Sequence, residues 1–468
     1  MAADVNDQPV FWALLGLLAW APLPLGSNRT LPVAIMVVWS VCLVLGMLWC
    51  WRKHASLAWA QVARFSWPLA CLALLTAWVW LQTLPLPAEW LQLLSPEAWA
   101  VQADLPQQHI SLDVHQTRVL AALSVCLACV FLVVVLTVRD HARLDRLALW
   151  LVLVAAVQAV VAIALYSVKA KYFVFYFEVV HDRVKGSYSY HNLMAGYLVL
   201  CLSVGIGLML ARLGGTQPAP ASWKERTVRL FQFMLSPKML LRMVLVVLVI
   251  ALVLTRSRMG NSAFFIALLV VGLLTLALTR RSAPAMVALI VSLMVVDVVV
   301  VGTWVGLEKV VNRLEETTMT TAQGGREESV EARQDAARHA VDLYSAFPLT
   351  GTGAGTFYNS YIRYRTLAKG YFDHAHNDYI ELAADLGAVG MVLLGGLVGS
   401  TVVVSAINLA RRRSSLPRGM SFGVMMAVVA MAIHSTVDFN LQIPANAMLM
   451  VVVLAMGWVA YRLPSGRT

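Results

Sequence analysis

The sequence predicts an all-α polytopic membrane protein of about twelve transmembrane helices, with one long outer loop that caps the helix bundle. Of its 468 residues, 60% are hydrophobic and only 13% are charged, and the mean hydropathy is +0.73. A soluble domain has roughly half its residues apolar and about a quarter charged. Apolar runs of about 20 residues, each long enough to cross a hydrocarbon core of ~30 Å, recur along the chain.

Twelve spans are expected from these runs. The first run follows MAADVNDQP and has no small-residue cleavage site, so we expect a retained span and not a signal peptide. The expected spans are residues 9–25, 31–51, 67–84, 117–138, 147–168, 191–211, 240–255, 261–279, 285–306, 387–409, 420–436 and 445–461.

Positive charge predicts the orientation of these spans. The connections after even-numbered spans, with the C-terminal tail, hold twenty of the 36 Lys and Arg residues. The opposite side holds sixteen, of which eight lie in the single long loop 307–386. Because Lys and Arg in short loops mark the cytoplasmic face, we expect both termini in the cytoplasm and the long loop outside. The net charge of +11 is thereby explained without nucleic acid, and its cytoplasmic share favours contact with anionic membrane lipids.

Four regions follow from this topology. Residues 1–179 hold helices one to five, 180–306 hold helices six to nine with arginine-bearing outer loops, 307–386 form the outer loop, and 387–468 hold the last three helices. Within the outer loop, the segment EESVEARQDAARHAVDLYSAFP has helical periodicity and mixed charges, which predicts a helix on the outer membrane surface. All six cysteines fall in expected spans, so no disulfide framework is indicated.

The stretch 373–387, DHAHNDYIELAADLG, concentrates polar chemistry at the end of the outer loop. Asp378 is expected to cap a helix whose third residue is Glu381, a capping-box spacing. His376 lies just before this helix, where the positive end of the helix dipole disfavours imidazolium and favours a general base. The alternatives are that His374 and His376 are solvated loop residues, or that His-x-His with nearby carboxylates binds zinc. If Asp378 caps the helix, too few free ligands remain for a metal, so we expect no metal site.

Arginines occur at two other places on the expected outer side. Arg256 and Arg258 follow the seventh span in VLTRSRMGN, and Arg183 precedes the sixth span, near His191 and Asn192. Guanidinium groups bind phosphate oxygens bidentately, so convergent arginines suit a diphosphate. The alternative is snorkelling of arginine at a helix end. The glycines of LTGTGAGTF do not follow a phosphate-loop pattern, and no nucleotide or other cofactor is implied.

A last polar pair, His434 and Asp438, lies in HSTVDFN at an outward helix end. The two residues are four apart and able to pair, which favours a structural brace over direct catalysis. The aromatic run YNSYIRYR and the nearby Tyr379 offer rings that could stack on sugars, although interfacial anchoring explains them nearly as well.

Taken together, the segments SYHNLMAGYL, TRSRMG, PLTGTGAGTFYNSYIRYR, HAHNDYIELAADLG and HSTVDFNLQIPANA resemble the O-antigen ligase and O-antigen polymerase superfamily. These are bacterial inner-membrane glycosyltransferases of the GT-C class. The resemblance covers roughly residues 180–450, and its most specific element is His376-Asn377, nine residues, then Gly387.

The resemblance implies an enzyme that moves a glycan from undecaprenyl diphosphate to an acceptor sugar at the periplasmic face, with inversion and without a metal. It implies His376 as the base and Arg258, with Arg183 and Arg256, as diphosphate ligands. Asn377, Asp378, Glu381, His434 and Asp438 are expected to support them.

Several functions remain open at this stage. HAHNDY with a downstream HSTVDFN favours a polysaccharide polymerase, whose acceptor is a lipid-linked repeat unit. The alternatives are a ligase that acts on lipid A–core, a protein O-oligosaccharyltransferase, and a transporter or flippase for lipid-linked glycans. A transporter should show repeat symmetry and charged or broken helices at the membrane midplane, whereas few ionisable residues fall within the expected spans, Asp297 being the clearest. The glycan, its linkage, the acceptor and the oligomeric state do not follow from the sequence.

Overall fold

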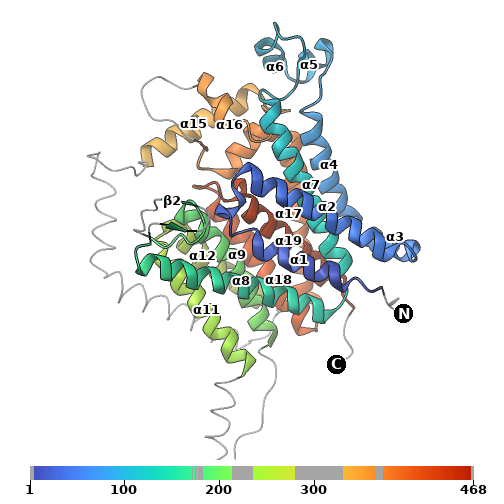
Figure 1. The fold of residues 1–468 in the computed structure, drawn as a ribbon, viewed down its shortest axis with the longest axis vertical. Helices are drawn as coiled ribbons and strands as arrows, with labels where there is room; N and C mark the ends of the chain where they lie inside the picture. The colour runs from blue at the N-terminus through green and yellow to red at the C-terminus, as the bar shows by residue number, and fades with distance from the viewer. Residues whose placement is uncertain are drawn as a thin grey trace, which may run out of the picture. The chain divides into compact units, whose positions relative to one another are not determined.

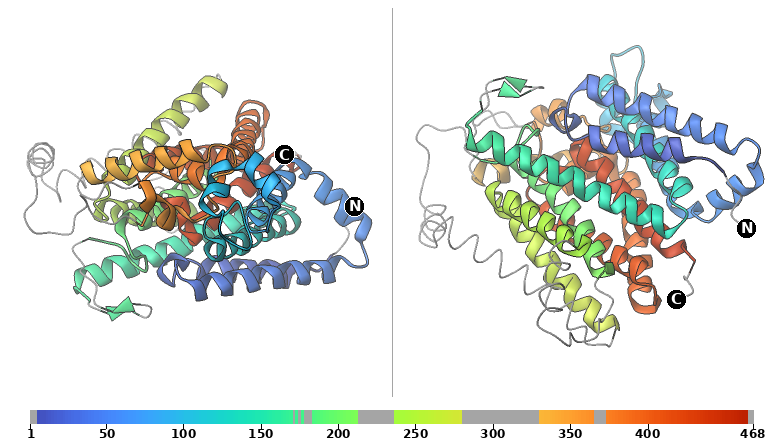
Figure 2. Two further views of the ribbon diagram at one scale, coloured as in Figure 1. Left: turned by 90° about the horizontal axis from the view of Figure 1, so that it is seen from above. Right: turned by 60° about the horizontal axis from the view of Figure 1, so that its bottom comes forward.

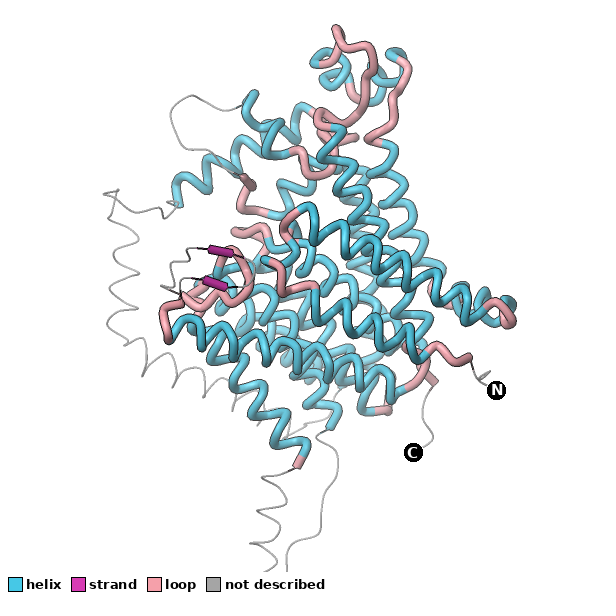
Figure 3. Tube along the Cα trace, viewed as in Figure 1, coloured by secondary structure: helices cyan, strands magenta, loops and turns pink. Residues whose placement is uncertain are grey.

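The computed structural model describes residues 5–170, 172–173, 176–177, 183–212, 236–279, 330–364 and 373–464. In these ranges the regular secondary structure is helical apart from one short antiparallel pair of strands, β1 (Tyr172–Phe173) and β2 (Tyr176–Phe177). Helices therefore dominate the trace (Figure 3), and the all-α class is confirmed.

Nine of the described helices are long and apolar enough to cross a membrane. They are α2 (Thr30–Trp51), α7 (Val114–Thr137), α8 (His141–Ser167), α9 (His191–Arg212), α11 (Pro237–Leu254), α12 (Arg258–Thr279), α17 (Asp378–Arg411), α18 (Ser415–His434) and α19 (Pro444–Arg462). Figure 1 labels each of them. A chain with this many apolar helices is a multi-pass membrane protein.

The other three expected spans differ from these nine. Helices α3 (Ala55–Ala63) and α4 (Ser66–Leu81) pass the test only as a pair, bent by 86°. Helix α1 (Gln8–Trp20) is apolar but has 13 residues, and the expected span 285–306 lies outside the described residues. The total of twelve stays a prediction.

The chain divides into two compact units. The first contains Met1–Arg139, Glu328–Val403 and Ala432–Arg462. Its central helix, α7, packs against α2, α4 and α19. The connection from α4 to α7 carries two short helices, α5 (Ala88–Leu94) and α6 (Pro96–Val101), which lie beyond the end of α4 (Figure 1).

The second unit contains Asp140–Glu327 and Val404–Met431. Helix α9 packs against α8, α11 and α12, and Figure 2 shows these helices from two further directions. A Cβ atom at Gly207 of α9 would collide with the backbone of Gly419 and Gly423 in α18. Small residues permit this close approach, as is common between helices in membranes.

The segment of the first unit that belongs to the expected outer loop matches the sequence prediction only in part. The expected helix is present as α15 (Val330–Ala346). Its Ala340 and Leu343 share a buried cluster with Phe357 and Tyr361, whose rings are stacked with centroids 5.0 Å apart. Because Tyr361 is 1% exposed, it is a core residue, and the alternative that its ring stacks on a sugar is wrong.

The glycine-rich turn at 349–356 wraps around a kink in α17. Its backbone N–H groups at Gly355 and Phe357 donate to the two carboxylate oxygens of Asp385, at 2.7 and 3.1 Å. Gln82 donates to the carbonyl of Asp385 and accepts from the N–H of Ala354. These contacts fix the turn against the last residues before the kink.

The kink itself is at Gly387, where φ is +65° and ψ is −174°. This conformation is essentially restricted to glycine. The expectation that a helix begins near Asp378 and passes through Gly387 into a span is therefore confirmed. The first part of α17 can take a different direction from its apolar body.

Candidate active site

The first turn of α17 carries most of the expected site residues. Its N-cap is Asn377, whose side-chain oxygen accepts hydrogen bonds from the backbone N–H groups of Tyr379 and Ile380 at 3.0 and 3.2 Å. The expectation that Asp378 caps the helix is wrong. An asparagine one residue earlier fills the role because its amide oxygen reaches the free N–H groups of the first turn.

Glu381 also differs from its expected role. Its carboxylate accepts from Nδ1 of His374 at 2.7 Å and from the backbone N–H of Ala375 at 2.8 Å. It is 2% exposed, so a buried charge is compensated by two donors from the loop that precedes the helix. Glu381 thereby fixes the conformation of the His374–Asn377 loop, instead of closing a capping box with residue 378.

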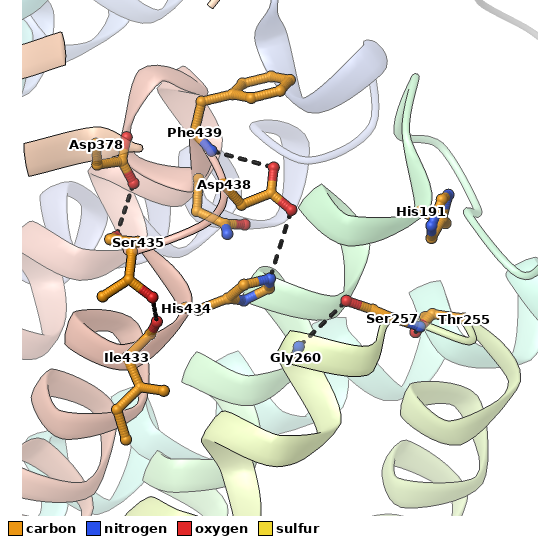
Figure 4. Close-up of polar contacts among 12 residues, drawn as sticks. His191, Thr255, Ser257, Gly260, Asp378, Ile433, His434, Ser435, Asp438 and Phe439 are labelled. Carbon is orange, nitrogen blue, oxygen red and sulfur yellow. Dashed lines mark hydrogen bonds and ion pairs between the residues drawn. The ribbon is translucent and has the colours of Figure 1, made fainter. Parts of the chain in front are cut away.

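Asp378 instead joins α17 to the segment 434–441, which connects α18 to α19. One of its carboxylate oxygens accepts from the hydroxyl of Ser435 at 2.7 Å and from the N–H of Leu441 at 3.2 Å. Its own N–H donates to the carbonyls of Ser435 and Asp438. Figure 4 shows the Asp378–Ser435 contact. The motifs HAHNDY and HSTVDFN, some sixty residues apart, therefore form one site.

Two neighbours of Asp378 reinforce this connection. The amide of Asn377 donates to the carbonyl of Thr436 at 3.0 Å, and the Tyr379 hydroxyl donates to the carbonyl of Ala432 at 2.8 Å. Tyr379 remains 44% exposed. Its ring is therefore open on one side while its tip is fixed.

Phe439 organises the two histidines of the loop. The His374 ring stacks on it with centroids 4.1 Å apart and planes 16° apart, and the His376 ring meets it edge-on at 5.1 Å and 76°. His376 is 7% exposed, so the alternative of a solvated loop residue is wrong for it. Its φ of +50° lies in the left-handed region, which is uncommon for residues other than glycine and recurs at functional sites.

The charges around these rings are coupled. Burial lowers the pKa of His374, but Glu381, with Asp373 and Asp378, outweighs burial and raises the pKa above its usual value. Burial raises the pKa of Asp438, yet the neighbouring His434, the N–H of Phe439 and His376 hold that pKa below its usual value.

His434 and Asp438 lie at an ion-pair distance. Nε2 of His434 is 3.7 Å from Oδ2 of Asp438 (Figure 4), which is too long for a hydrogen bond. Both side chains are buried, so their mutual attraction is weakly screened by solvent. The expected pairing of these two residues is present, whereas their role as a brace stays a prediction.

In the second unit, Arg183 contacts the start of α9. Its guanidinium lies 3.0 Å from Nε2 of His191. Because arginine has only donors, His191 must accept at Nε2 and is held as the neutral Nδ1–H tautomer. The next residue, Val184, donates its N–H to the carbonyl of Leu254 at the end of α11. The loop that carries Arg183 is thus tied to the helix end that precedes Arg256.

Arg256 and Arg258 flank a sharp break between α11 and α12. The Ser257 hydroxyl accepts from the N–H of Gly260 at 3.2 Å, which makes Ser257 the N-cap of α12 (Figure 4). Asn261 donates to the carbonyl of Ser257, and Arg256 takes a left-handed φ of +54°. Both arginine side chains are exposed. The break therefore presents two cations beside a helix N-terminus, a place where anions bind readily.

The expected residues thus fall into two groups. His376, Asn377, Asp378, Glu381, His434 and Asp438 lie together in the first unit, and Arg183, Arg256 and Arg258 lie in the second. Sequence reasoning missed three residues that hold the first group and its surroundings. Phe439 packs on the two histidine rings, Ser435 donates to Asp378, and Asp385 holds the glycine-rich turn. No local signal in the sequence identifies Phe439, because aromatic residues are common near membrane interfaces.

Metal binding is the other alternative for the histidine loop. Among the residues that the structure describes, no group of three or more His, Cys, Asp and Glu side chains has an arrangement that could hold a metal ion. His374 is already committed to Glu381, and Asp378 to Ser435 and Leu441. Independence from metal stays a prediction about the reaction.

Comparison with known proteins adds one finding. No curated protein matches the chain, but residues 243–395 match the family model described as "O-Antigen ligase". This range runs from α11 through the Arg256–Arg258 break to the His376–Gly387 motif and into α17. The match covers less than half of the chain and supports the resemblance to the O-antigen ligase and polymerase superfamily.

Proposed function

We propose that the chain transfers a glycan from undecaprenyl diphosphate to a hydroxyl group of an acceptor sugar at the periplasmic face of the bacterial inner membrane. The observation that carries this proposal is the fixed histidine loop. His376 is held in a left-handed conformation against Phe439, inside the range that matches the O-antigen ligase family. The match to the family model supports glycan transfer in general, and the donor, acceptor and residue roles are proposed here.

In the proposed step, His376 accepts the proton of the acceptor hydroxyl as its oxygen attacks the anomeric carbon of the donor sugar. The bond from that carbon to the diphosphate oxygen breaks, and undecaprenyl diphosphate leaves. A single displacement of this kind inverts the anomeric centre. The proton then passes from His376 to water.

The leaving diphosphate gains negative charge, which Arg258, Arg256 and Arg183 would neutralise. Preorganised cations directed at a developing charge lower the barrier without reorganisation during the step. Three guanidinium groups offer this compensation without a metal. Glu381, Asn377 and Asp378 hold the loop, and His434 and Asp438 support the segment beneath it.

A purified-enzyme assay tests the base. His376→Ala should lose about 10²–10⁴-fold of turnover, the usual contribution of general-base catalysis, while it still binds the lipid-linked donor. His115→Ala is the matched control, because His115 is exposed at the start of α7. Wild-type turnover should persist in excess EDTA. A loss of only a few-fold would remove His376 from the role, and activity restored by zinc after EDTA would overturn the metal-free mechanism.

The acceptor requires a separate experiment. Our expectation from the sequence is a polymerase, while the matched family description names a ligase. Deletion of the gene followed by electrophoresis of surface polysaccharide distinguishes them. Single-unit caps would identify a polymerase, and loss of the whole ladder with lipid-linked polymer retained would identify a ligase. An unchanged glycan profile would contradict both.

A further inference from the structure

Helix α3 is oriented almost perpendicular to α4, the helix that follows it. It forms an angle of 86° with α4, and none of its residues is buried. Leu57 and Trp59 are 43% and 72% exposed. If α4 crosses the membrane, a helix perpendicular to it lies parallel to the membrane surface. Apolar side chains on such a helix are typical of one that rests in the lipid interface.

Two side chains attach α3 to the ends of other spans. The Gln61 amide donates to the carbonyl of Val135 at the end of α7, at 3.2 Å, and Arg64 donates to the carbonyl of Arg462 at the end of α19, at 2.8 Å. Carbonyls in the last turn of a helix have no partner within the helix and carry partial negative charge. These bonds place α3 across the ends of α7 and α19, and therefore at the edge of the bundle.

A cavity of about 260 Å³ lies between α3, the last turns of α2 and the last turns of α7. Its walls include Met47, Ala58, Val62 and Leu136 and are largely apolar. A cavity with such walls favours hydrocarbon over water.

Polar and charged side chains line one part of the cavity. Trp51 lines the cavity, and its indole N–H is buried with no hydrogen-bond acceptor among the described residues. Arg52 also lines it, with its guanidinium 3.6 Å from the centre of the Trp49 ring. Lys53 follows and is exposed. An apolar chamber bordered by cations and an indole donor matches a molecule with a hydrocarbon tail and an anionic head.

We propose that this cavity binds an acyl chain of an anionic phospholipid from the leaflet on which α3 rests, with the lipid phosphate at Arg52 and Lys53. Charge selects the ligand, because anionic lipids attract clustered Lys and Arg at a membrane surface. The orientation of the spans predicts the cytoplasmic leaflet. The site is independent of the proposed glycan transfer, whose arginines lie in the other unit.

Native mass spectrometry of the full chain in detergent tests this proposal with two probes, phosphatidylglycerol and the zwitterionic phosphatidylethanolamine. The wild type should bind one phosphatidylglycerol more tightly than the zwitterionic lipid. Arg52→Gln should weaken that binding about fivefold, the effect of one surface cation at about 1 kcal/mol. Ala58→Leu should weaken it by filling the cavity. Ala60→Leu is the matched control on α3, since Ala60 does not line the cavity, and it should bind as the wild type does.

Competition identifies the ligand further. Excess inorganic phosphate should not displace phosphatidylglycerol, because the hydrocarbon tail holds the lipid. Undecaprenyl phosphate that displaced it at lower concentration would overturn the phospholipid assignment in favour of the polyprenyl carrier. Equal binding of both phospholipids, or unchanged binding by folded Ala58→Leu and Arg52→Gln, would overturn the site itself. Size-exclusion profiles of the variants establish that they are folded.

Discussion

At the scale of single residues, the His374–Glu381 pair links the loop conformation to pH. The pKa of His374 is raised on folding, with burial opposed by the charge and hydrogen bond of Glu381. A group whose pKa rises on folding contributes stability that is present below its unfolded value, about 6.5 for histidine, and is lost as pH rises through the folded value. The pair therefore stabilises the loop most on the acidic side of neutrality.

We expect Glu381→Gln to lower the thermal midpoint of the purified protein, and more so at about pH 6 than at about pH 8.5, across the range in which His374 titrates. The measurement is unfolding in detergent at both pH values. Glu97→Gln is the control, because Glu97 is exposed on α6, and it should show no such dependence. A deficit that grows toward alkaline pH would contradict the pairing.

The arginines on the other unit provide a second test at this scale. Arg258→Lys keeps the positive charge but loses the planar fork that contacts two phosphate oxygens at once. We expect a large loss of glycan transfer with normal insertion into the membrane. Arg338→Lys, in the outer-loop helix α15, is the control and should remain active. Near-full activity of Arg258→Lys would favour simple snorkelling at the helix end.

At the scale of elements, the kink in α17 sets the direction of the site-bearing turn. Gly387→Ala would force a side chain into a conformation that only glycine adopts, and its Cβ would collide with the carbonyl oxygen of Leu349. The dihedral strain alone costs roughly 1–3 kcal/mol. We expect a lower thermal midpoint and weaker transfer activity. Gly399→Ala on the same helix is the matched control, since its Cβ would meet nothing within 4 Å; equal midpoints for the two variants would show that the kink is dispensable.

Helices could be predicted where neighbouring residues alone determine them. Apolar runs predict the described spans, and the helix of 330–346 follows from its periodicity. The cap illustrates the limit, because Asn377 and Asp378 are both good capping residues, and adjacent sequence does not decide between them. Only the contacts of Asp378 with Ser435 and Leu441, far along the chain, settle the choice.

The same limit applies to the site. His376, Glu381, His434 and Asp438 stand out as polar residues at the ends of apolar helices, so the sequence identifies them. Phe439 does not stand out, because an aromatic residue is common at a membrane interface. Its stacking on His374 depends on two loops that meet only in the folded chain. Likewise, Glu381 pairs with His374 and does not form a capping box, and this too depends on contacts that form only in the folded chain.

At the scale of the whole molecule, the proposed mechanism depends on which side of the membrane holds His376. The distribution of Lys and Arg predicts that the long loop lies outside and both termini inside. The histidine loop and the Arg256–Arg258 break belong to connections that the predicted topology assigns to the same side.

Single cysteines introduced into a cysteine-free variant test this orientation in spheroplasts with a membrane-impermeant thiol reagent. Those at Gly325 and Lys369 lie in the expected outer loop and should label in intact spheroplasts. Those at Gln217 and Ser415 follow even-numbered expected spans and should label only after permeabilisation. Labelling of all four after permeabilisation is the control for reactivity. The reverse pattern would place His376 in the cytoplasm, and a periplasmic transfer reaction would then be untenable.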